Sequence, residues 1–102
     1  MIKTTKPGLT EVPPEVCVDH DKENYHIEIE LPGVKKEDID LEVGEDALCV
    51  RAPKEDIVYS ACYSLAHSVD TGKVSARFKD GLLTIRAAFK HPIQVGVKVP
   101  IE

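Results

Sequence analysis

The chain has 102 residues, of which 42% are hydrophobic and 30% charged, a composition typical of one ordinary globular domain. Thirteen basic and eighteen acidic side chains give a net charge of −5, and the basic residues form no block or stripe, so nucleic acid and anionic membranes are poor partners. No apolar run approaches the roughly 18 residues that a membrane span requires. We therefore expect neither a nucleic-acid partner nor a membrane partner.

The opening segment, residues 1–14, is polar and contains three prolines, which indicates a flexible arm. It holds no apolar stretch that could serve as the core of a signal peptide, so we expect the chain to stay in the cytoplasm.

From residue 15 onward the sequence consists of short alternating runs separated by turn signals. The clearest run is residues 24–31 (NYHIEIEL), in which apolar side chains alternate with polar ones. Similar runs predict strands at residues 15–19, 39–43, 47–52 and 58–65. Residues 34–38 allow at most one helical turn, and residues 66–72 are expected to form a loop.

Residues 76–87 (ARFKDGLLTIRA) carry the strongest local signal, an Asp-Gly pair between two alternating arms. A two-residue type I′ turn at Asp80 and Gly81 sets Lys79 opposite Leu82 and puts the apolar residues of both arms on one face. This hairpin supplies two more strands. About seven short strands, with no long helical pattern between them, predict an antiparallel β-sandwich of the immunoglobulin type.

The tail, residues 90–102 (KHPIQVGVKVPIE), is different because two prolines and a glycine exclude it from a central strand. Its apolar side chains still recur at every second residue: Ile93, Val95, Val97, Val99 and Ile101. We therefore expect an extended segment with one apolar side, suited to an exposed sheet edge.

The chemistry-bearing residues predict no enzyme, metal site or cofactor. Cys17, Cys49 and Cys62 lie far apart in apolar runs, so we interpret them as buried thiols, although the sequence also allows one disulfide. The four histidines lack ligand spacing, and there is no phosphate-binding glycine loop. Carboxylates such as Glu28 and Glu42 fall at outward positions of strands, which favours a solvated face over catalytic pairs.

Four segments, in one order along the chain, resemble signature motifs of the small heat-shock proteins, which share the α-crystallin domain. The family patterns are L-P-G-V-K-K-E-D-I, F-x-L-P-x-x-V-D-x-x-K, A-x-x-x-N-G-V-L and I-x-I/V. The corresponding segments are Leu31–Ile39 (LPGVKKEDI), Tyr63–Lys73 (YSLAHSVDTGK), Ala76–Leu83 (ARFKDGLL) and Ile93–Val95 (IQV). Four motifs in the family's order are far more specific than any one of them.

The resemblance implies an α-crystallin-like domain over residues 15–90 and a C-terminal extension over residues 91–102. It implies an ATP-independent holdase that binds partly unfolded client proteins and associates with itself at least as a dimer. It places a client-binding or partner-binding groove between two strands, walled by Ile39, Leu41, Val43, Ala76 and Phe78. It makes Ile93 and Val95 the anchor that fills this groove, and it makes Asp80, Gly81, Leu82 and Leu83 the turn signature. From the residues alone, packing in the sandwich core is the stronger explanation for each wall position.

The chain also departs from the family pattern. Ala61 stands where many members have arginine, and Ala66 replaces the motif's proline. The connection between Ala52 and Val58 leaves no room for the long loop and extra strand that many microbial and plant members exchange between subunits. The absence of this loop and the short N-terminal arm favour a second hypothesis, an adaptor module similar to the CS-domain co-chaperones that docks on one folded partner.

Overall fold

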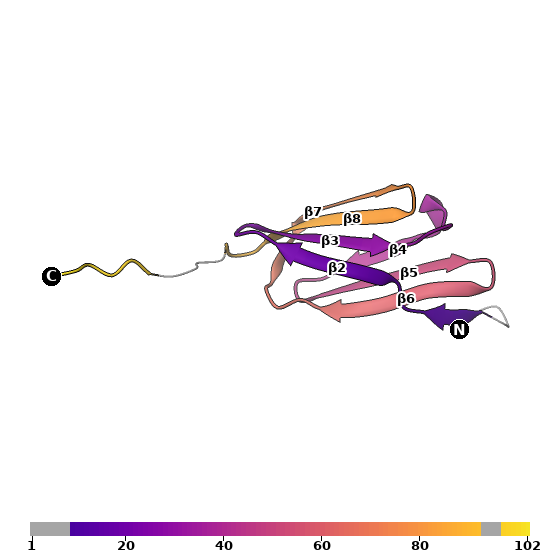
Figure 1. Ribbon diagram of the computed structural model, residues 1–102, viewed down its shortest axis with the longest axis horizontal. Coiled ribbons are helices and arrows are strands. Elements are labelled where there is room, and N and C mark those ends of the chain that lie inside the picture. Colours follow the sequence, from indigo (N-terminus) through magenta and orange to yellow (C-terminus); the bar gives the residue numbers. More distant parts are fainter. Residues whose placement is uncertain (1–8, 93–96) are drawn as a thin grey trace.

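A computed structural model describes residues 9–92 and 97–102, and Figure 1 shows them as a two-layer β-sandwich with the last residues leading away from it. Within these residues there are eight strands and one short 3₁₀ helix. In chain order they are β1 (Thr10–Val12), β2 (Glu15–His20), β3 (Asn24–Glu30), η1 (Lys36–Asp38), β4 (Asp40–Val43), β5 (Ala47–Lys54), β6 (Ile57–Ser64), β7 (Val69–Lys79) and β8 (Leu82–Phe89).

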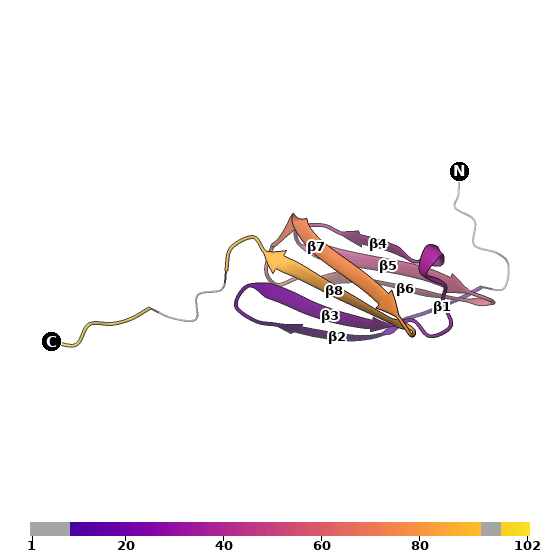
Figure 2. The ribbon, with the colours of Figure 1, turned by 90° about the horizontal axis from the view of Figure 1, so that it is seen from above.

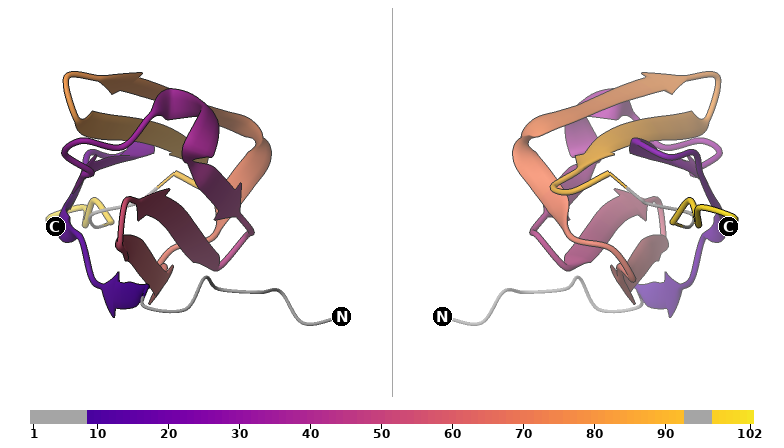
Figure 3. Two further views of the ribbon diagram at one scale, coloured as in Figure 1. Left: turned by 90° about the vertical axis from the view of Figure 1, so that its right-hand side faces the viewer. Right: turned by 90° about the vertical axis from the view of Figure 1, so that its left-hand side faces the viewer.

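Each layer is a four-stranded sheet. One has the strand order β1-β6-β5-β4 and the other the order β2-β3-β8-β7. Apart from the parallel pair β1 and β6, all neighbouring strands are antiparallel. The two layers are seen end-on in Figure 3. The predicted antiparallel sandwich is therefore confirmed.

The core lies between the layers and is built by the alternation that the sequence shows. In β3, Tyr25, Ile27 and Ile29 are buried whereas Glu28 and Glu30 are exposed. Alternation of this kind buries one face of a strand and leaves the other in water. The core residues are Tyr25, Ile27, Ile29, Leu31, Val34, Leu48, Val50, Ala52, Val69, Leu83, Ile85, Ala87 and Phe89.

The hairpin between β7 and β8 has the predicted geometry. Asp80 and Gly81 both have positive φ, at 52° and 80°, as a type I′ turn requires. Lys79 pairs with Leu82, so the predicted register is confirmed. The carbonyl oxygen of Gly81 also accepts a hydrogen bond of 2.7 Å from the N–H of Leu31, which connects this turn to the end of β3.

Two segments differ from the sequence-based expectation. Residues 10–12, expected in a flexible arm, form β1, because their backbone pairs in parallel with β6 far along the chain. Residues 69–72, expected in a loop, begin β7, where Val69 is fully buried opposite Phe89. An irregularity in the register between Val69 and Val74 interrupts the alternation that would have revealed this strand.

The interpretation of the cysteines as buried thiols is wrong. Cys49 of β5 and Cys62 of β6 lie directly opposite each other and form a disulfide on the outer face of their sheet. Cys17 is a free thiol and is exposed on β2. In each case alternation puts the cysteine on the outer face, next to an inward neighbour such as Leu48.

Candidate functional site: an open edge of the sandwich

The sandwich is open along one side, between β2 and the second half of β6. Figure 2 shows β1 and β2 on the same side of the molecule, with β4 and β7 on the opposite side. β1 pairs only with Ile57–Tyr59, so the rest of β6 has no partner strand on that side among the described residues. Because β1 has only three residues, the sheet β1-β6-β5-β4 is incomplete opposite β2.

The exposure of Val18 is the clearest evidence that this side is open. It alternates with the outward residues Cys17 and Asp19, so its side chain faces the other sheet. An inward valine is normally covered by the opposite layer, yet Val18 is 51% exposed. No described strand covers it, and its apolar surface remains in contact with water.

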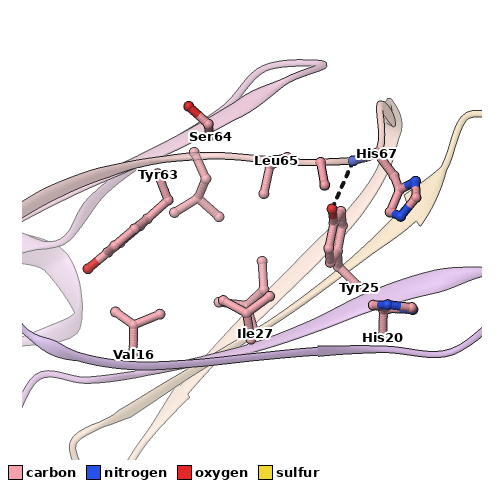
Figure 4. Close-up of a pocket in the computed structure, with 11 residues that line it drawn as sticks. Val16, His20, Tyr25, Ile27, Tyr63, Ser64, Leu65 and His67 are labelled. Atoms are coloured by element: carbon pink, nitrogen blue, oxygen red, sulfur yellow. Dashed lines mark hydrogen bonds between the residues drawn. The ribbon is translucent and has the colours of Figure 1, made fainter.

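A pocket of about 330 Å³ occupies the open side. In Figure 4 Val16 and Ile27 form one wall, with Tyr63 and Leu65 facing them from the other sheet. The full lining is Val16, Val18, His20, Tyr25, Ile27, Leu48, Tyr63, Ser64, Leu65, Ala66 and His67. Most of these side chains are apolar, so the pocket favours an apolar occupant.

One end of the pocket is closed by aromatic and histidine rings. The ring of Tyr25 meets the ring of Phe89 edge-to-face at a centroid distance of 4.9 Å. His67 packs against the same phenylalanine at 5.3 Å, and its backbone N–H donates a hydrogen bond of 2.9 Å to the Tyr25 hydroxyl (Figure 4). His20 lies 5.8 Å from His67 between ring centroids. This cluster fixes the loop after β6 against β3.

The arrangement suits recognition of an extended chain. An edge strand presents unpaired backbone N–H and C=O groups, to which another extended segment can bond. Alternate side chains of such a segment point the same way and would enter the pocket beside Val18. The described residues contain no cluster of three potential metal-ligating side chains. The site thus offers hydrogen bonds and apolar contact rather than reactive groups.

The residues predicted to wall a groove lie on the opposite side of the sandwich. Leu41 and Val43 on β4, and Ile39 just before it, are half-buried and pack against the core. Phe78 on β7 is also half-buried, whereas Ala76 is exposed. β4 and β7 are the edge strands of their sheets and run along the same side (Figure 2). The positions are therefore brought to one edge, and their role as groove walls stays a prediction.

The predicted anchor residues Ile93 and Val95 lie outside the described residues. The segment after them, residues 97–102, carries Val97, Val99 and Ile101, which are 79%, 76% and 95% exposed. These apolar side chains have the alternating spacing of an extended segment and are in contact with water.

The open-edge pocket could not be predicted from the sequence. Tyr25 and Ile27 of β3, and Tyr63 and Leu65 around the end of β6, have the alternation expected of ordinary core residues. Whether such residues are covered depends on which strands end each sheet, and this is a property of the topology. The disulfide could have been predicted from the short turn after β5. Cys49 and Cys62 are equally far from this turn, so a hairpin with a two-residue turn places them directly opposite each other.

None of the described residues forms a helix long and apolar enough to cross a membrane.

The model of the Hsp20/alpha crystallin family matches residues 17–102. Small heat shock protein C4 of Rickettsia felis is 32% identical over 94 residues, which cover 76% of this chain and 58% of the relative. The probable 15 kDa heat shock protein of Leptospira interrogans is 25% identical, with 98% of this chain and 88% of the relative covered.

Among solved structures, heat shock protein 16.0 from Schizosaccharomyces pombe superposes with a TM-score of 0.74 at 21% identity. The match covers 89% of this chain and 99% of that one. The likeness is that of the fold, a sandwich of two sheets. The chain spans just over half the length of the Rickettsia relative and most of the Leptospira one.

Proposed function

Because this chain belongs to the Hsp20/alpha crystallin family of small heat-shock proteins, we propose that it is an ATP-independent holdase. It binds apolar segments of partly unfolded client proteins and limits their aggregation. The family is not enzymatic.

The observation that carries the proposal is the uncovered inward position of Val18 beside the apolar pocket. An unfolding client exposes short apolar stretches that are covered in its native state. Such a stretch, in extended form, adds to the free part of the β6 edge and covers Val18. Backbone hydrogen bonds are independent of sequence, so this mode of binding accepts many clients.

The opposite edge provides the self-association that the sequence predicts. In this proposal Ile93 and Val95 of one subunit lie between β4 and β7 of another, against Leu41 and Phe78. Replacing both anchor residues by serine is expected to lower the mass of the assembly measured by light scattering. An unchanged mass would contradict this role for the anchor.

We place the activity in the cytoplasm, and the Cys49–Cys62 pair offers a test of that placement. Cytosolic glutathione and thioredoxin keep most thiols reduced. Trapping the thiols in intact cells by alkylation is therefore expected to show both cysteines reduced, whereas a stable disulfide in cells would favour an oxidising compartment.

The holdase is tested by heating an unrelated client enzyme with an equal number of subunits of this protein and without ATP, while aggregation is followed by light scattering. The native chain is expected to suppress aggregation strongly. Val18→Lys places a charge where the client's apolar side chains would lie, and it is expected to suppress aggregation much less. The matched control is Thr71→Lys, which adds the same charge at an exposed position of β7.

If Val18→Lys remains folded and protects the client as well as the native chain, the pocket is not the client site. If the native chain is folded and gives no protection, the holdase proposal is wrong. The adaptor hypothesis then takes its place. It is favoured by the connection between β5 and β6, in which only Glu55 and Asp56 separate Lys54 from Ile57. This turn provides no strand to exchange between subunits.

A further inference from the structure

The outer face of the sheet β2-β3-β8-β7 is divided into an acidic half and a basic half. β2 and β3 contribute Glu15, Asp19, Glu28 and Glu30, and β8 and β7 contribute Arg77, Lys79 and Arg86. All of these side chains are exposed. The rows across the sheet, from β2 to β7, are Glu15–Glu30–Leu82–Lys79, Cys17–Glu28–Thr84–Arg77 and Asp19–His26–Arg86–Ser75.

The charges of this face are not neutralised within the sheet. No row places a carboxylate directly opposite a lysine or arginine, and Glu15 lies directly opposite Glu30. Like charges in that position are destabilising. The ion pairs among the described residues are His26–Asp21, Lys73–Asp70 and Lys90–Glu45, and none of them includes a lysine, arginine or carboxylate of these three rows. The face therefore has charge complementarity that the single chain does not use.

Each half of the face is hollowed. Glu15, Glu28 and Glu30 line a depression on the acidic half, and Arg77 and Lys79 line another on the basic half, near Asp80 at the turn. Leu82 lines both depressions and marks the boundary between the halves. The surface is thus uneven, with room for long charged side chains that enter from outside.

We propose that this face binds the same face of a second copy of the chain. The two copies are related by a two-fold axis that lies in the plane between the two faces, parallel to the strands and over the boundary between β3 and β8. Rotation about this axis places β2 over β7 and β3 over β8, so each acidic half lies against a basic half. An in-plane axis across the strands would instead place β2 over β2 and set like charges against each other. Charge complementarity thus selects both the partner and the axis.

In this arrangement Glu15 lies over Lys79 of the second copy. Cys17 lies over Arg77 of that copy, and Glu28 lies beside the same arginine, over Thr84. A two-fold contact is self-complementary, so every such pair occurs twice. The face is mostly polar, with Leu82, Cys17 and Ala88 as the exceptions, and exposed ion pairs are individually weak. The association is therefore weak and sensitive to salt, and it is independent of the anchor at Ile93 and Val95 and of the client pocket.

The test uses charge reversal on the full-length chain. One variant, Glu15→Lys with Glu28→Lys and Glu30→Lys, leaves Asp19 as the only carboxylate among the charged residues named on this face. The other, Arg77→Glu with Lys79→Glu and Arg86→Glu, removes all three of its basic residues. A third variant combines all six changes, which exchanges the two halves and keeps the net charge at −5. The average mass of each is measured by sedimentation at salt concentrations of about 0.01 M and about 1 M.

We expect the native chain to be heavier at low salt than at high salt, and each half-reversed variant to lose this difference. An equimolar mixture of the two half-reversed variants is expected to recover it, because a basic face then meets an acidic one. The six-residue exchange is expected to recover it as well. Urea unfolding of each variant confirms that the sandwich is folded, and replacement of the same residues by glutamine serves where a reversal prevents folding.

The proposal is overturned if the native chain shows no salt-dependent mass, or if the half-reversed variants keep it. It is also overturned if both variants lose it and neither the mixture nor the exchange restores it. That last result would exclude net charge as the cause of the loss, since the exchange leaves the net charge unaltered, and would assign the effect to contacts of these residues with another surface.

Discussion

The backbone N–H of His67 donates a hydrogen bond of 2.9 Å to the hydroxyl of Tyr25, so the loop that connects the two sheets between β6 and β7 is held by a core residue of β3. Tyr25 is 4% exposed and its ring packs on Phe89. The hydroxyl is the polar end of a side chain that is otherwise buried. It marks the point where the closed core ends and the open-edge pocket begins.

Tyr25→Phe removes this hydrogen bond and keeps the ring. We expect the free energy of unfolding to fall by about 1 kcal/mol, the usual net value of such a bond. The His67 amide should also exchange its hydrogen faster, because the loop is no longer held. Urea unfolding and hydrogen exchange measure the two effects. An unchanged exchange rate at His67 would show that other contacts position the loop.

The strongly patterned parts of the fold could be predicted from the sequence. β3 and β8 alternate without interruption, and Asp80 with Gly81 determines their neighbour β7 by a short-range turn. β1 could not be predicted. Three residues next to two prolines have no pattern of their own, and they form a strand because β6 offers a backbone partner.

The candidate site was less predictable than the fold. The alternation that identifies Val16 and Val18 as inward residues is readable, but their exposure depends on how far β1 extends over β6. Likewise the sequence places Leu41 and Phe78 on separate strands, and only the sheet order brings β4 and β7 to one side. Local patterns define faces of strands, whereas edges are set by contacts between distant segments.

Gly81 provides a test of the turn between β7 and β8. Its φ of 80° is unfavourable for any residue with a Cβ, and a Cβ there would lie 3.3 Å from the Cα of Pro32. We expect Gly81→Val to lower the free energy of unfolding by at least about 1 kcal/mol. Asp80→Gly is the control, because glycine adopts the φ of 52° at that position without strain. Equal stability of Gly81→Val and the native chain would contradict the turn geometry.

Asp21 makes stability depend on pH in the acid range. Its pKa is held well below the usual range, chiefly by the hydrogen bond with Nε2 of His26 at 3.1 Å, and then by the N–H groups of Glu23 and Asn24, both at 2.7 Å. A carboxyl with a lowered folded pKa stabilises the fold above its unfolded pKa of about 3.9. That contribution is lost as the pH falls through the folded pKa.

Asp21→Asn is therefore expected to be less stable than the native chain near neutral pH, with a difference that shrinks steadily as the pH falls from about 5 to about 2. Urea unfolding at a series of pH values measures it. Asp40→Asn, at an exposed position of β4, is the control for the loss of one negative charge. A difference for Asp21→Asn that stays constant over this range would show that ionisation of the carboxyl is not its cause.

The Cys49–Cys62 disulfide closes a short loop around the turn between β5 and β6, with a sequence separation of 13 residues. Restricting the unfolded chain by a loop of this size is worth about 3 kcal/mol in the chain-entropy description. We expect Cys62→Ser, a change at an exposed position, to lower the free energy of unfolding by about 2–3 kcal/mol under oxidising conditions. A reductant should lower the stability of the native chain to the same level and leave the variant unaffected.

Cys17→Ser, which alters the free thiol on β2, is the matched control and is expected to change stability by less than about 0.5 kcal/mol. A native chain that is equally stable with and without reductant would show that this bond does not stabilise the fold.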